Sequence, residues 1–253
     1  MTTATEEWVR RFHPADQAPA RLVCFPHAGG SAPYFYHVGR MLAPGLDVLA
    51  VQYPGRQERR HEPVIDSVPE LADRVVEQLR PWLDRPFALF GHSLGAVLAY
   101  EVARRLEAEG RRPLGLLASG HRAPHVERHN TAHLLDDDGL IAELRRLSGT
   151  DDALLADDEL LRLVLPCVRG DYKAAETYTY RPGPPLACPI VGLTGDADPL
   201  VSVAEARGWV DHTTGGFELD VHPGGHFYLN DHVPALVERI RGFVARELAN
   251  VNS

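Results

Sequence analysis

The residues with the clearest chemical potential are one serine and the glycines on either side of it. Gly91, Ser93 and Gly95 fit the pattern Gly-x-Ser-x-Gly, in which the serine occupies a sharp strand-to-helix turn and the glycines prevent collisions with neighbouring backbone. Residues 86–90 form a short apolar run, and residues 94–106 carry apolar side chains at helical spacing. We therefore predict that Ser93 is a nucleophile. The alternative interpretation is a glycine-rich turn between two core elements.

A serine hydroxyl needs a general base, and that base needs a carboxylate. The histidine takes the serine proton, while the carboxylate fixes the tautomer of the imidazole. In proteins that use this turn, the carboxylate and then the histidine follow the serine along the chain, on loops after strands. Asp198 and His226 meet these conditions, so we predict that they complete a triad with Ser93. Asp196 is the rival carboxylate, and His222 lies nearer to the end of its predicted strand.

Two backbone N–H groups are needed to stabilise the oxyanion that forms during attack. One belongs to the residue after the nucleophile, and the other to a loop after an earlier strand. The apolar residues 21–26 lead into the segment HAGG at 27–30, so we assign these roles to Ala28 and Leu94. By itself, that segment is more typical of an ordinary strand-to-helix turn. The serine motif downstream is what favours the catalytic interpretation.

A histidine series after residue 120 suggests a metal site at first sight. His121, His125, His129 and His133 recur at every fourth position, so on a helix they would share one face. Pro124 interrupts the segment, however, and no Cys-x-x-Cys or His-Glu-x-x-His motif accompanies it. We therefore expect no metal and no cofactor.

The elements that must position these residues alternate between apolar strands and helical segments. Because helices connect consecutive strands, the strands must run parallel in one sheet, which defines the α/β class. The predicted strands are 8–12 (an edge strand), 21–26, 46–52, 86–90, 114–119, 188–195 and 217–221. The predicted helices are 33–42, 68–83, 94–106, 137–147, 158–178, 203–210 and 233–248.

The alternation stops between about residues 121 and 185, where two helical segments occur with no strand between them. We interpret this region as a helical lid inserted into a single domain that covers residues 1–253. The apolar face of its second helix either roofs a pocket or packs into a core. Pro166 is expected to end or bend that helix. The residues of the apolar face are Leu160, Leu161, Val164 and Leu165.

The composition excludes several classes of function. The chain has 253 residues, 44% of them apolar, which suits one α/β domain with a sizeable core. Its 26 basic and 35 acidic residues give a net charge of −9, which argues against nucleic acid or membrane surfaces as partners. We expect a cytoplasmic protein for three reasons. The three cysteines are widely spaced, the N-terminal segment is unlike a secretion signal, and there is no long apolar run.

Five motifs follow one another in a characteristic order. They are FPHAGG at 25–30, YPGR at 53–56 followed by Arg59, GHSLG at 91–95, GDAD at 195–198 and GHF at 225–227. In this order they resemble the type II thioesterases, stand-alone α/β-hydrolases associated with polyketide and nonribosomal-peptide assembly lines. The resemblance extends from about residue 8 to residue 245. Residues 165–171, with Glu176 and Tyr178, also look like the lid helix of that family.

The resemblance implies an α/β-hydrolase fold and a specific activity. Members of the family hydrolyse acyl groups from the phosphopantetheine arm of acyl or peptidyl carrier proteins and so remove stalled or mis-primed units. Phosphopantetheine is then part of the substrate and not a cofactor. Leu94 stands where methionine is frequent in relatives. Because this position contributes a backbone N–H, the difference affects only the local shape of the pocket.

A carrier-protein partner raises a question of charge. The resemblance implies an acidic partner, whereas this chain itself carries −9. A local basic patch would resolve the conflict, and Arg56, Arg59 and Arg60 follow a predicted strand at the sheet edge that should also hold Ser93. We therefore consider these arginines as a docking surface. The alternative is a solvated charge run in which Arg56 braces the adjacent Pro-Gly turn.

Two other functions are compatible with the same residues. A carboxylesterase would use the same triad on oxygen esters. A catalytically silent binding module of the hydrolase fold is disfavoured, because such modules usually lack a triad residue and none is missing here.

Overall fold

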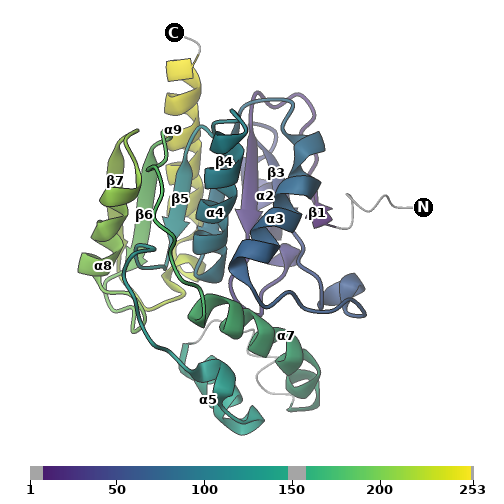
Figure 1. Cartoon of the computed structure of the whole chain (residues 1–253). Coiled ribbons are helices and arrows are strands. Elements are labelled where there is room, and N and C mark those ends of the chain that lie inside the picture. The colour runs from purple at the N-terminus through teal and green to yellow at the C-terminus, as the bar shows by residue number, and fades with distance from the viewer. Residues whose placement is uncertain (1–7, 148–157, 252–253) are drawn as a thin grey trace.

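A parallel sheet forms the centre of the computed structural model, which describes residues 8–147 and 158–251. Within these residues, seven strands form one sheet in the order β1-β3-β2-β4-β5-β6-β7 (Figure 1). Neighbouring strands are parallel, except that β1 pairs antiparallel with β3 at the edge. The strands are β1 Val9–Arg10, β2 Arg21–Phe25, β3 Asp47–Val51, β4 Phe87–His92, β5 Leu116–Ser119, β6 Ile190–Gly195 and β7 Phe217–His222.

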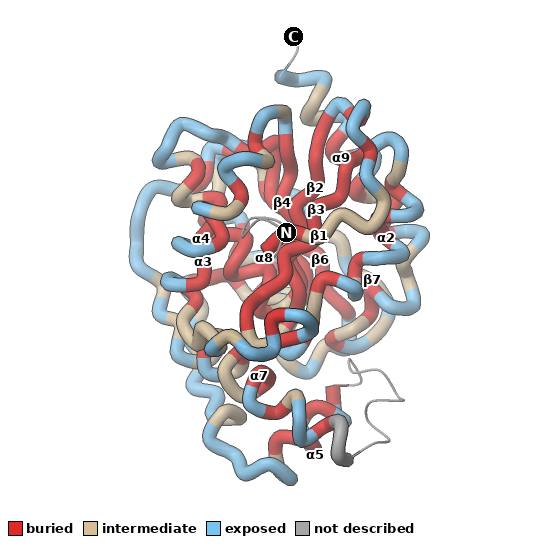
Figure 2. The backbone as a smooth tube through the Cα atoms, turned by 90° about the vertical axis from the view of Figure 1, so that its right-hand side faces the viewer, coloured by how far each residue is buried: buried red, intermediate tan, exposed pale blue. Residues whose placement is uncertain are grey.

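Helices cover both faces of the sheet, which is why the inner strands read as continuous apolar runs. Along β2, Val23 and Phe25 pack into the same apolar cluster as helices α3 and α4, whereas Leu22 and Cys24 pack with α2 and α9 on the opposite face. Figure 2 shows the resulting buried centre of the chain. These helices, with the short α8, are α2 Tyr36–Leu42, α3 Val68–Leu79, α4 Leu94–Ala108, α8 Val203–Arg207 and α9 Val233–Val251.

The sequence-based boundaries are wrong mainly at helix ends. The helix predicted over residues 33–42 begins with the 3-10 turn Ala32–Phe35, and the one predicted over 68–83 ends with the 3-10 turn Arg80–Trp82. A proline lies in each of these turns. Proline lacks the N–H of a regular helix, so such residues favour helix ends over helix interiors.

Two helices, α5 (Asp137–Leu147) and α7 (Asp158–Glu176), are inserted between β5 and β6. They lie together beyond one end of the sheet (Figure 1). Leu161 and Leu165 of α7 pack against Leu140 and Leu144 of α5. The face formed by Leu161, Val164 and Leu165 therefore packs into a core with α5; the side chain of Leu160 is not among those described.

Pro166 lies within α7 and does not end this helix, whereas the predicted bend at this residue stays a prediction. Leu165 and Val168, on either side of the proline, pack into the same cluster with α5. This packing stabilises the helix across the missing backbone hydrogen bond. None of the helices described here is long and apolar enough to cross a membrane.

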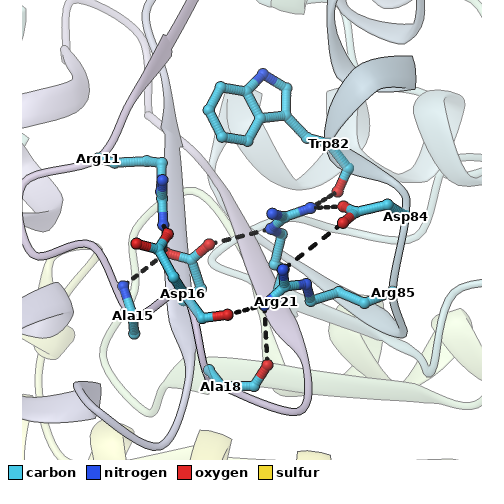
Figure 3. A network of polar contacts seen from close by, with 9 residues as sticks. Arg11, Ala15, Asp16, Ala18, Arg21, Trp82, Asp84 and Arg85 are labelled. Atoms are coloured by element: carbon cyan, nitrogen blue, oxygen red, sulfur yellow. Dashed lines mark hydrogen bonds and ion pairs between the residues drawn. The ribbon is translucent and has the colours of Figure 1, made fainter.

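A polar network anchors the N-terminal segment to the sheet (Figure 3). Asp47, at the start of β3, has a fully buried carboxylate that accepts hydrogen bonds from Arg11 at 3.0 Å and Arg21 at 3.0 Å. It also accepts the backbone N–H of Ala15 at 3.2 Å. Arg21 has further partners in Asp84 and the Trp82 carbonyl. The carboxylate is thus fully satisfied, as a buried charge must be.

We predict that Asp47→Ala lowers the free energy of unfolding by about 3 kcal/mol, because it removes the buried carboxylate that pairs with the buried Arg21 guanidinium. Urea denaturation measures this loss. Asp16→Ala is the matched control: its carboxylate also pairs with Arg11 but is 73% exposed, so the cost should stay below about 1 kcal/mol. Equal losses in both variants would contradict the assignment of Asp47 as the anchor.

Candidate active site

Ser93 occupies the sharp turn between β4 and α4 that the sequence predicts. Its backbone has φ +55° and ψ −121°, a conformation that non-glycine residues rarely adopt. The flanking glycines permit this turn. A Cβ atom on Gly91 would lie 2.0 Å from the carbonyl oxygen of Gly95, and one on Gly95 would lie 2.1 Å from the carbonyl oxygen of Phe25. Backbone segments therefore pack directly against each other around the serine.

The three residues of the predicted triad meet at the carboxyl ends of β4, β6 and β7. The distance from Ser93 Oγ to His226 Nε2 is 3.0 Å, and that from His226 Nδ1 to Asp198 Oδ2 is 2.8 Å. The other carboxylate oxygen of Asp198 accepts the N–H of Leu200 at 2.8 Å. The side chain of Asp198 is 0% exposed and that of His226 is 3% exposed. This chain of contacts allows His226 to accept a proton from Ser93 while Asp198 holds the imidazole.

The rival residues have different partners. Asp196 is exposed and accepts the N–H of Gly224 at 2.9 Å, so its carboxylate ties the loop after β6 to the loop that carries His226. His222 stacks on Tyr228, with ring centroids 5.1 Å apart. Neither side chain forms a hydrogen bond with Ser93 within the described part of the chain. Asp196 thus stabilises the loop that carries His226 without contacting the catalytic groups through a hydrogen bond.

Two buried histidines for which the sequence motifs predict no role, His27 and His92, lie close to His226. The His92 ring centroid is 5.1 Å from that of His226. Burial, followed by the charge of His226, holds the pKa of His92 well below its usual value and lowers the pKa of His27 to about 3. Both imidazoles are therefore neutral near pH 7. A histidine within an otherwise apolar strand was the available sequence signal for His92.

A hydrogen-bond network holds His92 in place. Its Nδ1 lies 3.0 Å from Ser119 Oγ, and that hydroxyl lies 2.7 Å from the Tyr228 hydroxyl. These groups come from β4, β5 and the loop after β7. The network therefore joins the strand that carries Ser93 to the segment that follows His226.

A cavity of about 480 Å³ opens beside the triad. Ser93 and His226 line it, together with Ala28 and Leu94, the two residues predicted to supply the oxyanion N–H groups. Leu144 of α5 and Tyr172 of α7 also line the cavity, along with the loop after β5. The inserted helices therefore form part of the wall of the cavity that contains Ser93.

Arg56 does not belong to an exposed docking surface, which corrects the first of the three arginine predictions. It is buried and donates hydrogen bonds of 2.7 and 2.8 Å to the carboxylate of Asp171 in α7. It also donates to the carbonyl oxygens of Gly30 at 3.0 Å and Pro54 at 3.3 Å. The alternative, in which Arg56 braces the Pro-Gly turn, describes part of this arrangement.

Arg59 is likewise buried, so the docking prediction is wrong for this residue too. Its guanidinium lies 4.0 Å from the centre of the Trp8 ring and donates to the Gln52 carbonyl at 2.7 Å. It also pairs with Glu62 at 2.5 Å. A planar guanidinium can stack and form several hydrogen bonds at once, which favours its burial. Arg60 is exposed, and its docking role stays a prediction.

The four regularly spaced histidines do not share a helix face, because residues 120–131 form a loop. His125 lies 2.7 Å from His212, and His133 lies 2.5 Å from Glu176. His121 contacts the backbone carbonyl of Arg122 at 2.6 Å. Within the described residues, no group of three or more histidine, cysteine or acidic side chains is arranged to hold a metal ion.

The sheet topology, the serine turn and the loop geometry together define an α/β-hydrolase. A family model for the thioesterase domain matches residues 20–244. Thioesterase PikA5 of Streptomyces venezuelae is 55% identical over 226 residues, which are 88% of this chain and 80% of that protein. The probable cadicidin biosynthesis thioesterase of Streptomyces griseus is 51% identical over 239 residues, which are 93% of this chain and 66% of that longer protein.

The structure of the type II thioesterase BorB, from the borrelidin biosynthetic cluster, superimposes with a TM-score of 0.91 at 50% identity. The match covers 96% of this chain and 100% of BorB. The chain therefore belongs to the thioesterase family. The predictions of an α/β-hydrolase fold and of a type II thioesterase, a thioester hydrolase, are confirmed.

We predict that the buried neutral His27 makes folding sensitive to acid. Its pKa is lowered from 6.5 to about 3, so between these values the unfolded state binds a proton that the folded state does not. Stability is therefore complete above about pH 6.5 and falls as the pH decreases toward 3, by up to about 1.4 kcal/mol per pH unit.

His27→Phe should remove this contribution. The replacement keeps a ring against Tyr34 and Phe227, and it breaks no bond at Nδ1, which lacks a hydrogen-bond partner among the described residues. Urea denaturation of both proteins between pH 7 and pH 5 measures the two slopes. An unchanged pH slope in His27→Phe would show that His27 is not the neutral group that we describe.

Proposed function

We propose that this thioesterase hydrolyses acyl groups from the phosphopantetheine arm of acyl or peptidyl carrier proteins and so releases stalled or aberrant units. One observation carries the proposal: the hydrogen-bonded series Ser93, His226 and Asp198 opens into a cavity, in a chain that belongs to the thioesterase family. Both relatives named above are thioesterases, and one of them is named for cadicidin biosynthesis. BorB comes from the borrelidin biosynthetic cluster, and together these similarities support the same substrate class.

The first half of the reaction transfers the acyl group to the serine. His226 Nε2, 3.0 Å from Ser93 Oγ, accepts the hydroxyl proton as Oγ attacks the thioester carbonyl. The N–H groups of Ala28 and Leu94 stabilise the resulting oxyanion. The C–S bond then breaks, and the proton on His226 passes to the departing thiolate, which leaves as the free thiol of the arm.

The second half returns the serine to its starting state. His226 removes a proton from a water molecule, which attacks the acyl-serine carbonyl, and the same proton passes to Ser93 Oγ as the ester bond breaks. Throughout, the buried carboxylate of Asp198 keeps Nδ1 protonated and stabilises the positive charge on the ring. Both steps use one base and one oxyanion site, so no metal or cofactor takes part in this scheme.

The inserted helices suit a substrate that enters as a flexible arm. We treat residues 1–253 as a single α/β-hydrolase domain in which residues 121–185 form a lid, because residues of α5 and α7 line the cavity that contains Ser93. Docking of the carrier does not rely on Arg56 or Arg59, which are buried. Arg60 is exposed and is retained as a docking residue.

A cytoplasmic location agrees with three buried cysteines that are all free thiols.

We predict that the wild-type protein hydrolyses a propionyl carrier protein with a higher kcat/KM than a small oxygen ester of propionic acid. Asp198→Asn should lower kcat on the thioester by about 10⁴-fold, because an amide favours the wrong imidazole tautomer. Mass spectrometry of the carrier protein measures the loss of the acyl group, and a chromogenic assay measures hydrolysis of the oxygen ester.

Asp196→Asn is the matched control. Its carboxylate accepts a hydrogen bond from Gly224 and none from His226, so kcat should change by less than about tenfold. A preference for the oxygen ester would favour the alternative function, a carboxylesterase with the same triad. If Asp196→Asn were the slower variant, the assignment of the triad carboxylate would be wrong.

A further inference from the structure

Among the described residues that line the catalytic cavity, three are arginines, and two of them are neutralised by carboxylates. Arg128 donates to both oxygens of Glu205 at 2.7 and 2.8 Å and to the Leu200 carbonyl at 2.8 Å. Arg146 donates to both oxygens of Glu143 at 2.7 and 2.8 Å. These two guanidinium groups therefore serve the structure of the cavity wall.

Arg122, the third arginine, has no such partner. Its Nε donates to the backbone carbonyl of Val126 at 2.8 Å, and within the described residues no ion pair joins it to a carboxylate. The acidic side chains that influence it most are Glu205 and Glu176. Glu205 is engaged by Arg128, as described above.

Glu176 is also occupied. It accepts the backbone N–H groups of Ala132 and His133, each at 3.0 Å, and its carboxylate lies 2.5 Å from the His133 ring. Three donors thus already surround this carboxylate. The acidic groups near Arg122 are consequently committed to other donors.

The electrostatics agree with an incompletely balanced cation. Burial and then the charge of Arg128 lower the pKa of Arg122 from its usual value, although Glu205 and Glu176 act in the opposite direction. An arginine remains charged at neutral pH even so. An anionic group in the cavity would therefore be stabilised by Arg122.

The backbone places Arg122 near the reacting atoms. The N–H of Ser93 donates to the carbonyl of Ser119 at 2.8 Å, and Ser119 pairs with His92 at the carboxyl ends of β5 and β4. Arg122 follows Ser119 by three residues and lines the same cavity as Ser93 and His226. Arg122 therefore belongs to the wall of the cavity that a substrate bound at Ser93 would occupy.

We propose that Arg122 forms an anion-binding subsite of the catalytic cavity that recognises an anionic oxygen group on the thioester substrate. A guanidinium binds carboxylates and phosphates through two parallel hydrogen bonds. The group is either a terminal carboxylate on the acyl chain or the phosphate of the phosphopantetheine arm. The inference rests on the proposed function only in taking the ligand to be a thioester.

Four matched thioesters separate the two sources of the anion. Pentanoyl and glutaryl groups have the same number of carbons but differ in the terminal carboxylate, and each is joined either to pantetheine or to 4′-phosphopantetheine. We expect Arg122→Met to lower kcat/KM about tenfold or more for the substrates that carry the recognised anion, and to leave the others nearly unchanged. Arg122→Lys, which keeps the charge, should retain part of the selectivity.

The pattern across the four substrates decides the outcome. A loss confined to glutaryl substrates identifies the acyl carboxylate, and a loss confined to phosphopantetheine substrates identifies the phosphate. Equal losses for all four would overturn the proposal, as would no loss for any. Arg111→Met, at an exposed position beyond α4, controls for a general effect of charge. Arg122→Gln, which keeps a donor for Val126, replaces Arg122→Met if the latter does not fold.

A binding measurement separates this inference from the proposed function. If the wild-type protein hydrolysed neither these thioesters nor an acyl carrier protein, the proposed function would fail. The Kd values of the same four thioesters, measured by calorimetry with Ser93→Ala and with Ser93→Ala combined with Arg122→Met, would still test the subsite. Selective weakening of the anionic thioesters supports it, and equal Kd values in both proteins contradict it.

Discussion

The buried ion pair between Arg56 and Asp171 joins segments that lie far apart in the sequence. Asp171 belongs to the inserted helix α7, and Arg56 follows β3. The same carboxylate accepts the N–H of Gly29 at 2.7 Å, and the same guanidinium donates to the carbonyl of Gly30 at 3.0 Å. The position of α7 and the conformation of the loop next to Ala28 are therefore fixed by one interaction.

This constraint explains how a strained site persists. A buried ion pair is favourable only when its remaining donors and acceptors are satisfied, and here the backbone of the loop after β2 satisfies them. The serine turn is stabilised similarly, by close backbone packing around Ser93 and by the neutral His92 held by Ser119. Because the nearby imidazoles of His27 and His92 are neutral, no like charge repels the proton that His226 takes up during the reaction.

The sequence predicted the triad and the sheet because both depend on local patterns. Apolar runs identify the strands, and the carboxyl ends of parallel strands necessarily share one edge, so Ser93, Asp198 and His226 could be brought together without coordinates. The burial of Arg56 and Arg59 could not be predicted in this way. Each packs against a residue that is distant in the sequence, Asp171 for Arg56 and Trp8 for Arg59. A run of arginines in the sequence does not reveal whether the side chains contact such residues or solvent. That α7 continues past Pro166 was unpredictable for the same reason, since the packing against α5 is not visible in the local sequence.

The central claim is that Ser93 is the nucleophile activated by His226. A fluorophosphonate probe, which forms a covalent phosphonyl ester only with an activated serine hydroxyl, tests this claim most directly. After incubation with the wild-type protein, peptide mass spectrometry should find the label on the peptide that contains Ser93. Ser93→Ala and excess acyl thioester should each prevent labelling. A label on another residue, or full thioesterase activity in a folded Ser93→Ala variant, would contradict the account.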